Sequence, residues 1–220
     1  MSSAFVVNAD IKPPNDITQA SRSLFIKCDL MEFLFEGIDE LEPTEPNLKL
    51  VDVNLIGVIY TAKLAAHYFH RQPRETFDRC LIVVGSIMGF IDTQGSSIYG
   101  AAKHGVRGLM CCLRRKGALR VNLLAPWFTA TDIMPRDFME SLTQQFRAQG
   151  LDFAAVEDAV SAVFRIITDS SINGRSIAVV PRQLSASGYL DLDLDDFVAG
   201  TPADKMQKVA SSISYGFMSK

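Results

Sequence analysis

Three polar residues, Ser86, Tyr99 and Lys103, have the types and spacing that proton transfer needs. Tyr99 and Lys103 stand four apart at the head of an apolar helical pattern, so both side chains lie on one face of the predicted helix. An ammonium group beside a phenol favours the ionised phenol, and the pair therefore predicts a lowered pKa for Tyr99. Ser86 follows an apolar run, Leu81–Val84, and can hydrogen-bond the same substrate oxygen. Together they predict a proton-transfer site at the carboxyl end of a strand, where open α/β sheets hold ligands.

The elements that must position these residues are a buried strand over residues 81–84, a loop over 85–96 and a helix that runs to about Arg115. A tyrosine and a lysine four residues apart also occur on many solvated helices, so the pair alone is weak evidence of catalysis. The buried strand and the serine thirteen residues before the tyrosine make the catalytic interpretation much stronger.

With this spacing, the stretch resembles the catalytic segment of the short-chain dehydrogenase/reductase family. The segment Val53–Gly57, VNLIG, resembles the family's VNxxG segment, whose asparagine (Asn54 here) helps to hold a proton-relay water. The segment Ala125–Thr131, APWFTAT, resembles the PGxxxT segment, with Trp127 in place of the usual glycine. The resemblance covers roughly residues 4–30 and 45–182, and it is closest to a fungal branch related to hydroxyprostaglandin-type dehydrogenases.

The resemblance implies NAD-linked interconversion of an alcohol and a carbonyl on a small apolar substrate, within fungal secondary metabolism. Tyr99 would pass a proton to or from the substrate oxygen, and Ser86 would polarise that oxygen. Lys103 would lower the pKa of Tyr99 and hold the nicotinamide ribose. Asn54 would support the water relay. The cofactor would be NAD.

Residues 4–11 and 24–29 match the family's second and third strands in this resemblance. Asp10 would then bind the adenosine ribose hydroxyls and select NAD, and Asp29 would lie beside the adenine. Thr131 would contact the cofactor near the nicotinamide. From the residues alone, each acid is more often a strand-terminal turn residue, and Thr131 suits the N-cap of a helix over residues 132–150. In another register, Asn8–Asp10 is an altered copy of the family's fourth-strand NAG motif.

The chain departs from the family at the turn that binds the cofactor's phosphates. Residues 1–30 contain no glycine, so they lack the TGxxxGxG turn, and a second block that includes the fourth strand also has no counterpart. The expected fold is α/β, a Rossmann-like doubly wound and mostly parallel sheet, incomplete for want of the first and fourth family strands. We expect one domain over residues 1–220, with a truncated cofactor half (1–45), a catalytic half (46–182) and a C-terminal tail (183–220).

Two other functions stay open at this point. A cofactor-independent isomerase, cyclase or dehydratase could use the Ser-Tyr-Lys site, since proton-transfer groups are retained where a phosphate cradle is not. The chain could also be a non-catalytic remnant or a partner subunit.

Further helices are expected over residues 48–72 and 156–168, and further strands over 119–125 and 176–180. In the family, the first of these helices and the helix after Tyr99 form the dimer interface, which implies a homodimer. Gly105 and Gly108 would allow close helix approach there or within the chain. His67 and His70 lack a further ligand, so no metal site is expected. The run LDLDLDDF near the C-terminus is interpreted as a solvated acidic edge.

The composition limits the partners. The 220 residues carry a net charge of −3, which gives no basic surface for nucleic acid. No uninterrupted apolar run reaches the roughly 18 residues of a membrane span, and the first ten residues do not resemble a signal peptide. Four cysteines without a CxxC pair favour reduced thiols. These features predict a cytoplasmic protein whose partner is a small-molecule substrate, without nucleic acid or membrane.

Overall fold

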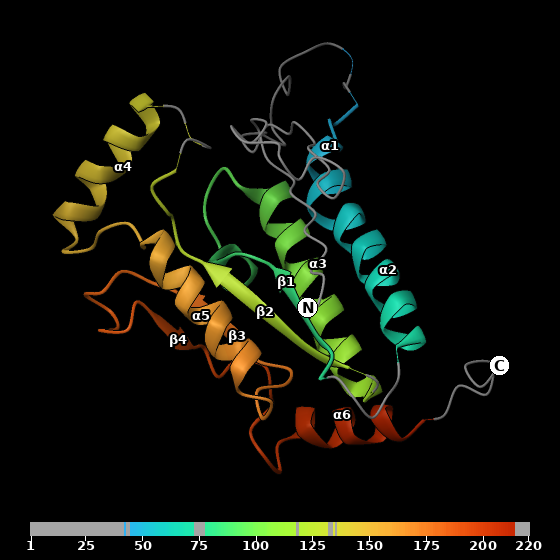
Figure 1. Cartoon of the computed structure of the whole chain (residues 1–220). Coiled ribbons are helices and arrows are strands. Elements are labelled where there is room, and N and C mark those ends of the chain that lie inside the picture. The colour runs from blue at the N-terminus through green and yellow to red at the C-terminus, as the bar shows by residue number, and fades with distance from the viewer. Residues whose placement is uncertain are drawn as a thin grey trace.

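The computed structural model describes residues 42, 45–72, 78–117, 119–131, 134 and 136–213. Within them, a four-stranded sheet carries helices on both faces (Figure 1). The predicted strands over residues 4–11 and 24–29, and with them Asp10 and Asp29, lie outside the described residues.

The sheet has the strand order β1-β2-β3-β4, with β1 at Cys80–Val84, β2 at Arg120–Pro126, β3 at Ser176–Val179 and β4 at Tyr189–Asp191. The first three strands are parallel, with Val84 opposite Leu124, and β4 is antiparallel to β3. Apolar runs rich in valine, isoleucine and leucine suit such strands, because both faces of a central parallel strand are covered. The predicted α/β, mostly parallel sheet is confirmed, whereas β4 was not predicted.

Each of the predicted helices is present. The helices of the described residues are α1 Lys49–Val51, α2 Gly57–Arg71, α3 Ser97–Leu113, α4 Arg136–Ala148, α5 Val156–Thr168 and α6 Pro202–Ser212. A π-helical turn over Asp52–Ile56 joins α1 to α2, and together they form the helix expected over residues 48–72. The bounds of α5 agree with the prediction, and α6 was not predicted.

Of three clusters of buried apolar side chains, two cover the sheet, one on each face. On one face, Val106 and Met110 of α3 pack against Val121 and other residues of β2. On the opposite face, Ile166 of α5 packs against Leu124 and neighbouring strand residues. Successive residues of β2 point to opposite faces, so one strand supplies both clusters. This arrangement fixes α3, and with it Tyr99 and Lys103, against the sheet.

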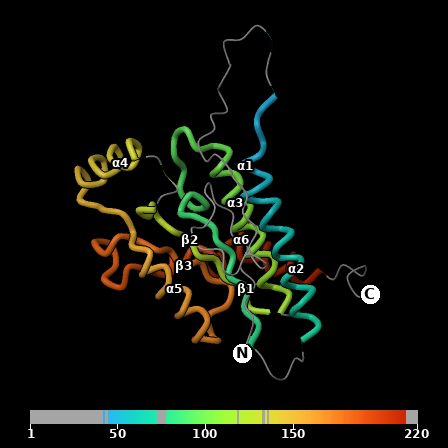
Figure 2. The backbone as a smooth tube through the Cα atoms, turned by 45° about the horizontal axis from the view of Figure 1, so that its top comes forward, coloured from blue at the N-terminus to red at the C-terminus, as the bar shows by residue number. Residues whose placement is uncertain are grey.

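The α1–α2 helix runs alongside α3 (Figures 1 and 2). Leu50 is buried there against Ile98 and Ala102 of α3. A Cβ atom on Gly105 would lie 2.9 Å from the side chain of Leu55, so this glycine permits close packing within the chain. Gly108 has no such neighbour within 4 Å among the described residues.

The outer face of the same helix is apolar. Among its exposed side chains are Ile56, Ile59, Tyr60, Leu64 and Tyr68. By length and composition alone, the segment Lys49–Arg71 could cross a membrane, although a single such helix is weak evidence, since core helices of soluble proteins pass the same test. No uninterrupted apolar run of that length is present in the segment, because polar residues such as Asp52 and Lys63 interrupt it.

The acidic C-terminal run was expected to be a solvated edge, and for Asp195 this was wrong. The Asp195 side chain is buried and accepts hydrogen bonds from the Ser176 backbone N–H at 2.8 Å and hydroxyl at 3.0 Å. Arg175 forms ion pairs with Asp191 at 2.7 Å and Asp193 at 2.6 Å. The run thus attaches the C-terminal segment to β3 through charged hydrogen bonds.

Candidate active site

Ser86 lies where β1 ends and a short 3₁₀ turn, Ile87–Gly89, begins. Its side chain is buried, and its hydroxyl accepts a hydrogen bond from the Met88 backbone N–H at 3.2 Å. The turn packs closely on α3, because a Cβ atom on Gly89 would lie 2.9 Å from the Lys103 carbonyl oxygen. The serine is therefore held by a capping hydrogen bond and by backbone packing.

Tyr99 lies in the first turn of α3 and is half-buried, in contact with the cluster around Leu50 and Ile98. Burial raises the pKa of the Tyr99 hydroxyl above its ordinary value, and a side-chain hydrogen bond with Ser86 partly opposes the rise. The structure thus brings together Ser86 and Tyr99, which are thirteen residues apart in the sequence.

Lys103 lies one helical turn after Tyr99, and its side chain is buried. Its Nζ atom lies 5.4 Å from the centroid of the Tyr99 ring and donates a long hydrogen bond, 3.5 Å, to the Val84 carbonyl oxygen. Burial lowers the pKa of Lys103 to about 8. The three predicted catalytic side chains therefore meet at the carboxyl end of β1.

The predicted lowering of the Tyr99 pKa was wrong for this structure. The ammonium of Lys103 lies over the ring rather than at the hydroxyl, and burial weakens its own positive charge. Burial of the phenol is the larger effect, and it favours the neutral form.

Asn54 lies in the π-helical turn, and its side-chain amide donates to the Leu50 carbonyl oxygen at 3.1 Å. Turns of this kind are frequent at functional sites, and this one contacts α3. The role of Asn54 in a water relay remains a prediction.

Thr131 is exposed and follows the segment that leaves β2. The helix α4 begins only at Arg136, so Thr131 is not its N-cap residue, contrary to the expectation from sequence. Its contact with a cofactor remains a prediction.

Four aromatic rings, which sequence reasoning did not single out as a group, cluster beyond the end of β2. Trp127 lies 5.2 Å from Phe128 and 5.4 Å from Phe146, and Phe146 lies 5.2 Å from Phe153, measured between ring centroids. Phe146 belongs to α4, and the other three rings belong to the segments before and after that helix. The signal was the density of aromatic residues between positions 127 and 153.

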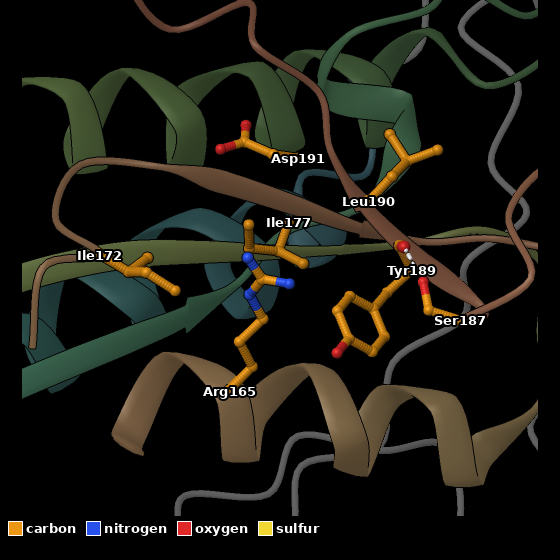
Figure 3. Close-up of a pocket in the computed structure, with 7 residues that line it drawn as sticks. All are labelled: Arg165, Ile172, Ile177, Ser187, Tyr189, Leu190 and Asp191. Carbon is orange, nitrogen blue, oxygen red and sulfur yellow. Dashed lines mark hydrogen bonds between the residues drawn. The ribbon is translucent and has the colours of Figure 1, made fainter. Parts of the chain in front are cut away.

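One hollow of about 130 Å³ lies at the other side of the sheet, between α5 and strands β3 and β4 (Figure 3). Arg165 extends from α5 toward it, and the ring of Tyr189 points toward α5. It is lined by Arg165, Ile172, Ile177, Ser187, Tyr189, Leu190 and Asp191. None of the predicted catalytic residues lines it.

The described residues contain no group of three or more side chains that could hold a metal ion. Of the two histidines considered, His67 lies 3.3 Å from Arg71, an exposed contact within α2.

The described residues fit one end of a nicotinamide cofactor. The buried ammonium of Lys103 makes one long hydrogen bond among them, which leaves donors for the hydroxyls of a ribose. Thr131 is exposed near the end of β2 and is available to a ligand. The residues predicted for the adenosine end, Asp10 and Asp29, lie outside the described part of the chain.

Known proteins resemble this chain over most of its length. A family model described as short chain dehydrogenase matches residues 2–141. The 5'-hydroxyaverantin dehydrogenase of Dothistroma septosporum is 34% identical over 190 residues, which are 80% of this chain and 58% of that protein. An NADP-dependent dehydrogenase of Phoma sp. is 32% identical over 169 residues, covering 70% of this chain and 48% of that protein.

Solved structures share the fold. A 4-hydroxyisoleucine dehydrogenase complexed with NADH superposes with a TM-score of 0.60 at 18% identity, covering 79% of this chain and 86% of that one. The chain spans about half the length of the curated relatives it matches. The family match and the Rossmann-like α/β architecture together show that the chain belongs to the short-chain dehydrogenase/reductase family.

Proposed function

We propose that Ser86, Tyr99 and Lys103 form the catalytic site of an oxidoreductase that interconverts an alcohol and a carbonyl on a small apolar substrate. The observation that carries the proposal is the meeting of these side chains at the end of β1, with Ser86 close enough to influence the pKa of the Tyr99 hydroxyl and the Lys103 ammonium against the tyrosine ring. Relatives named as dehydrogenases, among them fungal ones, support the reaction class and a place in fungal secondary metabolism.

In this proposal a nicotinamide cofactor, when bound, supplies or accepts the hydride. Tyr99 donates its hydroxyl proton to the substrate oxygen during reduction, and its raised pKa keeps that proton in place near neutral pH. Ser86 donates a second hydrogen bond to the same oxygen. Lys103 holds the ribose, and Asn54 supports the return of a proton to Tyr99 through water.

The proposed cofactor is NAD, because Asp10 matches the acid that binds the adenosine ribose in NAD-dependent relatives. Thr131 and Asp29 would be its other contacts. The name of the Phoma relative specifies NADP, so both nucleotides belong in any assay.

We further propose a cytoplasmic homodimer, and the exposed apolar face of α2 supports a second copy packing there.

The test is turnover by the Tyr99→Phe variant. With reduced nucleotide and a panel of apolar ketones, the change should lower the rate by at least about 100-fold, because the proton donor is lost. Tyr60→Phe, at an exposed tyrosine of α2, is the matched control and should keep the wild-type rate. Circular dichroism should show both variants folded. If the Tyr99→Phe variant retains full activity, the catalytic assignment is wrong.

A cofactor-independent isomerase or dehydratase is the second candidate. The neutral Tyr99 hydroxyl, held by Ser86, could serve as an acid without a nucleotide. Isomerisation of a hydroxyketone by the chain in the absence of nucleotide, lost in Tyr99→Phe, would favour this candidate over hydride transfer.

A further inference from the structure

The indole N–H of Trp127 is buried and has no hydrogen-bond partner among the described residues. Native structures rarely leave a buried donor without an acceptor, so a buried N–H without a partner indicates that its acceptor comes from elsewhere. Trp127 is also the only tryptophan in the chain. The residue as a whole is half-buried.

Aromatic rings surround the indole. The Phe128 ring meets it edge-on, with an interplanar angle of 80°, and the Phe146 ring is tilted by 42°. The two phenylalanine rings also contact each other at 5.4 Å between centroids. A set of rings in these orientations offers both edges and faces, which a further aromatic ring could contact favourably.

Phe146 is the one ring of this set that a helix carries. It belongs to α4, in which Leu142 is the one buried residue, and α4 stands beyond the end of β2, away from the sheet (Figure 1). The helix ends in a turn at Gly150, whose positive φ of 70° is a conformation that suits glycine. A small shift of α4 would lift Phe146 from the indole.

The aromatic set lies at the same edge of the sheet as the candidate active site. Strands β1 and β2 are adjacent and parallel, and Val84 and Leu124 are paired near their ends. Ser86 follows β1, and Trp127 follows β2. A substrate that reaches Ser86 therefore enters at the edge where Trp127 is found.

We propose that Trp127, Phe128 and Phe146 recognise an aromatic ring of the substrate. The ring takes the place of Phe146 against the indole, and an oxygen on the same molecule accepts the Nε1–H bond. The substrate class is thus a planar aromatic molecule with a carbonyl or hydroxyl oxygen. This deepens the proposed function, on which it rests, but binding tests it without turnover.

Isothermal titration of the full chain with three probes tests both parts of the recognition. Acetylnaphthalene has the ring and the acceptor, ethylnaphthalene has only the ring, and cyclohexyl methyl ketone has only the acceptor. Acetylnaphthalene should bind about tenfold more tightly than ethylnaphthalene, as one added hydrogen bond would give. The cyclohexyl ketone should bind more weakly than both.

Variants distinguish the contribution of the indole N–H to probe binding from that of the aromatic rings. Trp127→Phe keeps a ring but removes the donor, so the preference for acetylnaphthalene should disappear. Phe146→Leu removes the ring that competes with the probe, so both naphthalenes should bind more tightly. Phe164→Leu, at an exposed ring on α5, is the matched control and should bind all probes as the wild type does.

Equal affinity of the wild-type chain for the two naphthalenes would overturn the proposal, as would a preference that survives in Trp127→Phe. Even if a variant fails to fold, the affinities of the wild-type chain for the two naphthalenes still test the proposal. Tyr99→Phe should bind acetylnaphthalene normally. Normal binding without turnover of any ketone by the wild type would contradict the proposed function while leaving this recognition site in place.

Discussion

At the scale of single residues, Tyr99 and Lys103 occupy positions that oppose their charged forms. Burial raises the pKa of the tyrosine and lowers that of the lysine to about 8. The pair therefore approaches a neutral acid beside a weakened base, which is suited to giving a proton to a carbonyl oxygen.

The protonation state of Tyr99 can be measured directly. We expect Tyr99 to ionise only above about pH 10, its ordinary range, because burial favours the neutral phenol. The difference between the ultraviolet alkaline titrations of the wild type and Tyr99→Phe isolates this one group. A tyrosinate signal in that difference near neutral pH would show that the positive charge of Lys103 outweighs the effect of burial on the Tyr99 pKa.

Lys103 should make stability depend on pH. Its folded pKa of about 8 lies below the ordinary value of 10.5, so between these values the unfolded chain holds a proton that the folded chain has released. The free energy of unfolding should therefore rise with pH across this window, by up to about 3 kcal/mol from this group. Lys103→Met should lack that rise.

Urea unfolding of the wild type and of Lys103→Met, near neutral pH and again at about pH 10, measures the effect. The methionine variant should gain most over the wild type near neutral pH. If the difference in unfolding free energy between the variant and the wild type is the same at both pH values, Lys103 has its ordinary pKa in the folded chain. Tyr99 also titrates in the alkaline range, but it is present in both proteins.

The positions of Ser86, Tyr99 and Lys103 could be predicted because they depend on local spacing: a strand end, a turn and one helix face. The direction of the Tyr99 pKa shift could not, because it depends on how deeply packing buries each group. The orphaned indole N–H of Trp127 could not be predicted either, since its neighbours Phe146 and Phe153 come from other segments.

At the scale of elements, the connection from β1 to α3 positions the site. The 3₁₀ turn after Ser86 rests on the backbone of α3 at Gly89, so the strand end and the helix are held together without intervening side chains. The relation between Ser86 and Tyr99 depends on that contact.

Gly89→Ala should disturb this contact. The added Cβ would lie 2.9 Å from the Lys103 carbonyl oxygen, and backbone on both sides must shift, so we expect a loss of about 1–3 kcal/mol in the free energy of unfolding. Gly108→Ala in α3 is the matched control, because its Cβ meets no described atom within 4 Å. It should stabilise the helix by about 0.5–1 kcal/mol. Equal effects of the two changes in urea unfolding would contradict this packing.

The sequence predicted β1, β2, β3 and α5 well because continuous apolar runs and helical periodicity mark buried elements. It did not predict β4, which has three residues and pairs with β3 at the edge of the described sheet. It also missed α6, whose Thr201 cap and Pro202 are helix-start signals but whose residues are nowhere buried. Short or exposed elements carry too little hydrophobic pattern to identify them.

At the scale of the whole molecule, aspartate side chains hold the C-terminal segment to α3 and to β3. The buried Asp195 lies 3.5 Å from Arg107 of α3 and accepts two hydrogen bonds from Ser176 of β3. Arg107 in turn stacks on Phe90, in the loop that follows Ser86, at 4.2 Å from the ring centroid. These contacts link residues far apart in the sequence. The local sequence LDLDLDDF does not reveal such partners, and by itself it therefore predicts a solvated acidic edge.

Asp195→Ala should cost about 3 kcal/mol of unfolding free energy, because it leaves a buried backbone N–H and hydroxyl without their charged acceptor. Asp193→Asn is the control. Asp193 is 84% exposed, its positive φ of 53° suits asparagine, and its ion pair with Arg175 should contribute less than about 1 kcal/mol. Thermal unfolding of both variants compares them. Similar small losses would show that the segment is not anchored through Asp195.

The family model matches residues 2–141, and the chain spans about half of its curated relatives. Binding of a whole dinucleotide is therefore the property on which the proposed redox function most depends. Isothermal titration of the folded chain with NADH and NADPH tests it, with Lys103→Met as the variant. We expect micromolar binding of at least one nucleotide, weakened about tenfold in Lys103→Met by loss of a charged hydrogen bond to the ribose. Failure of a well-folded chain to bind either nucleotide would contradict the proposed hydride transfer.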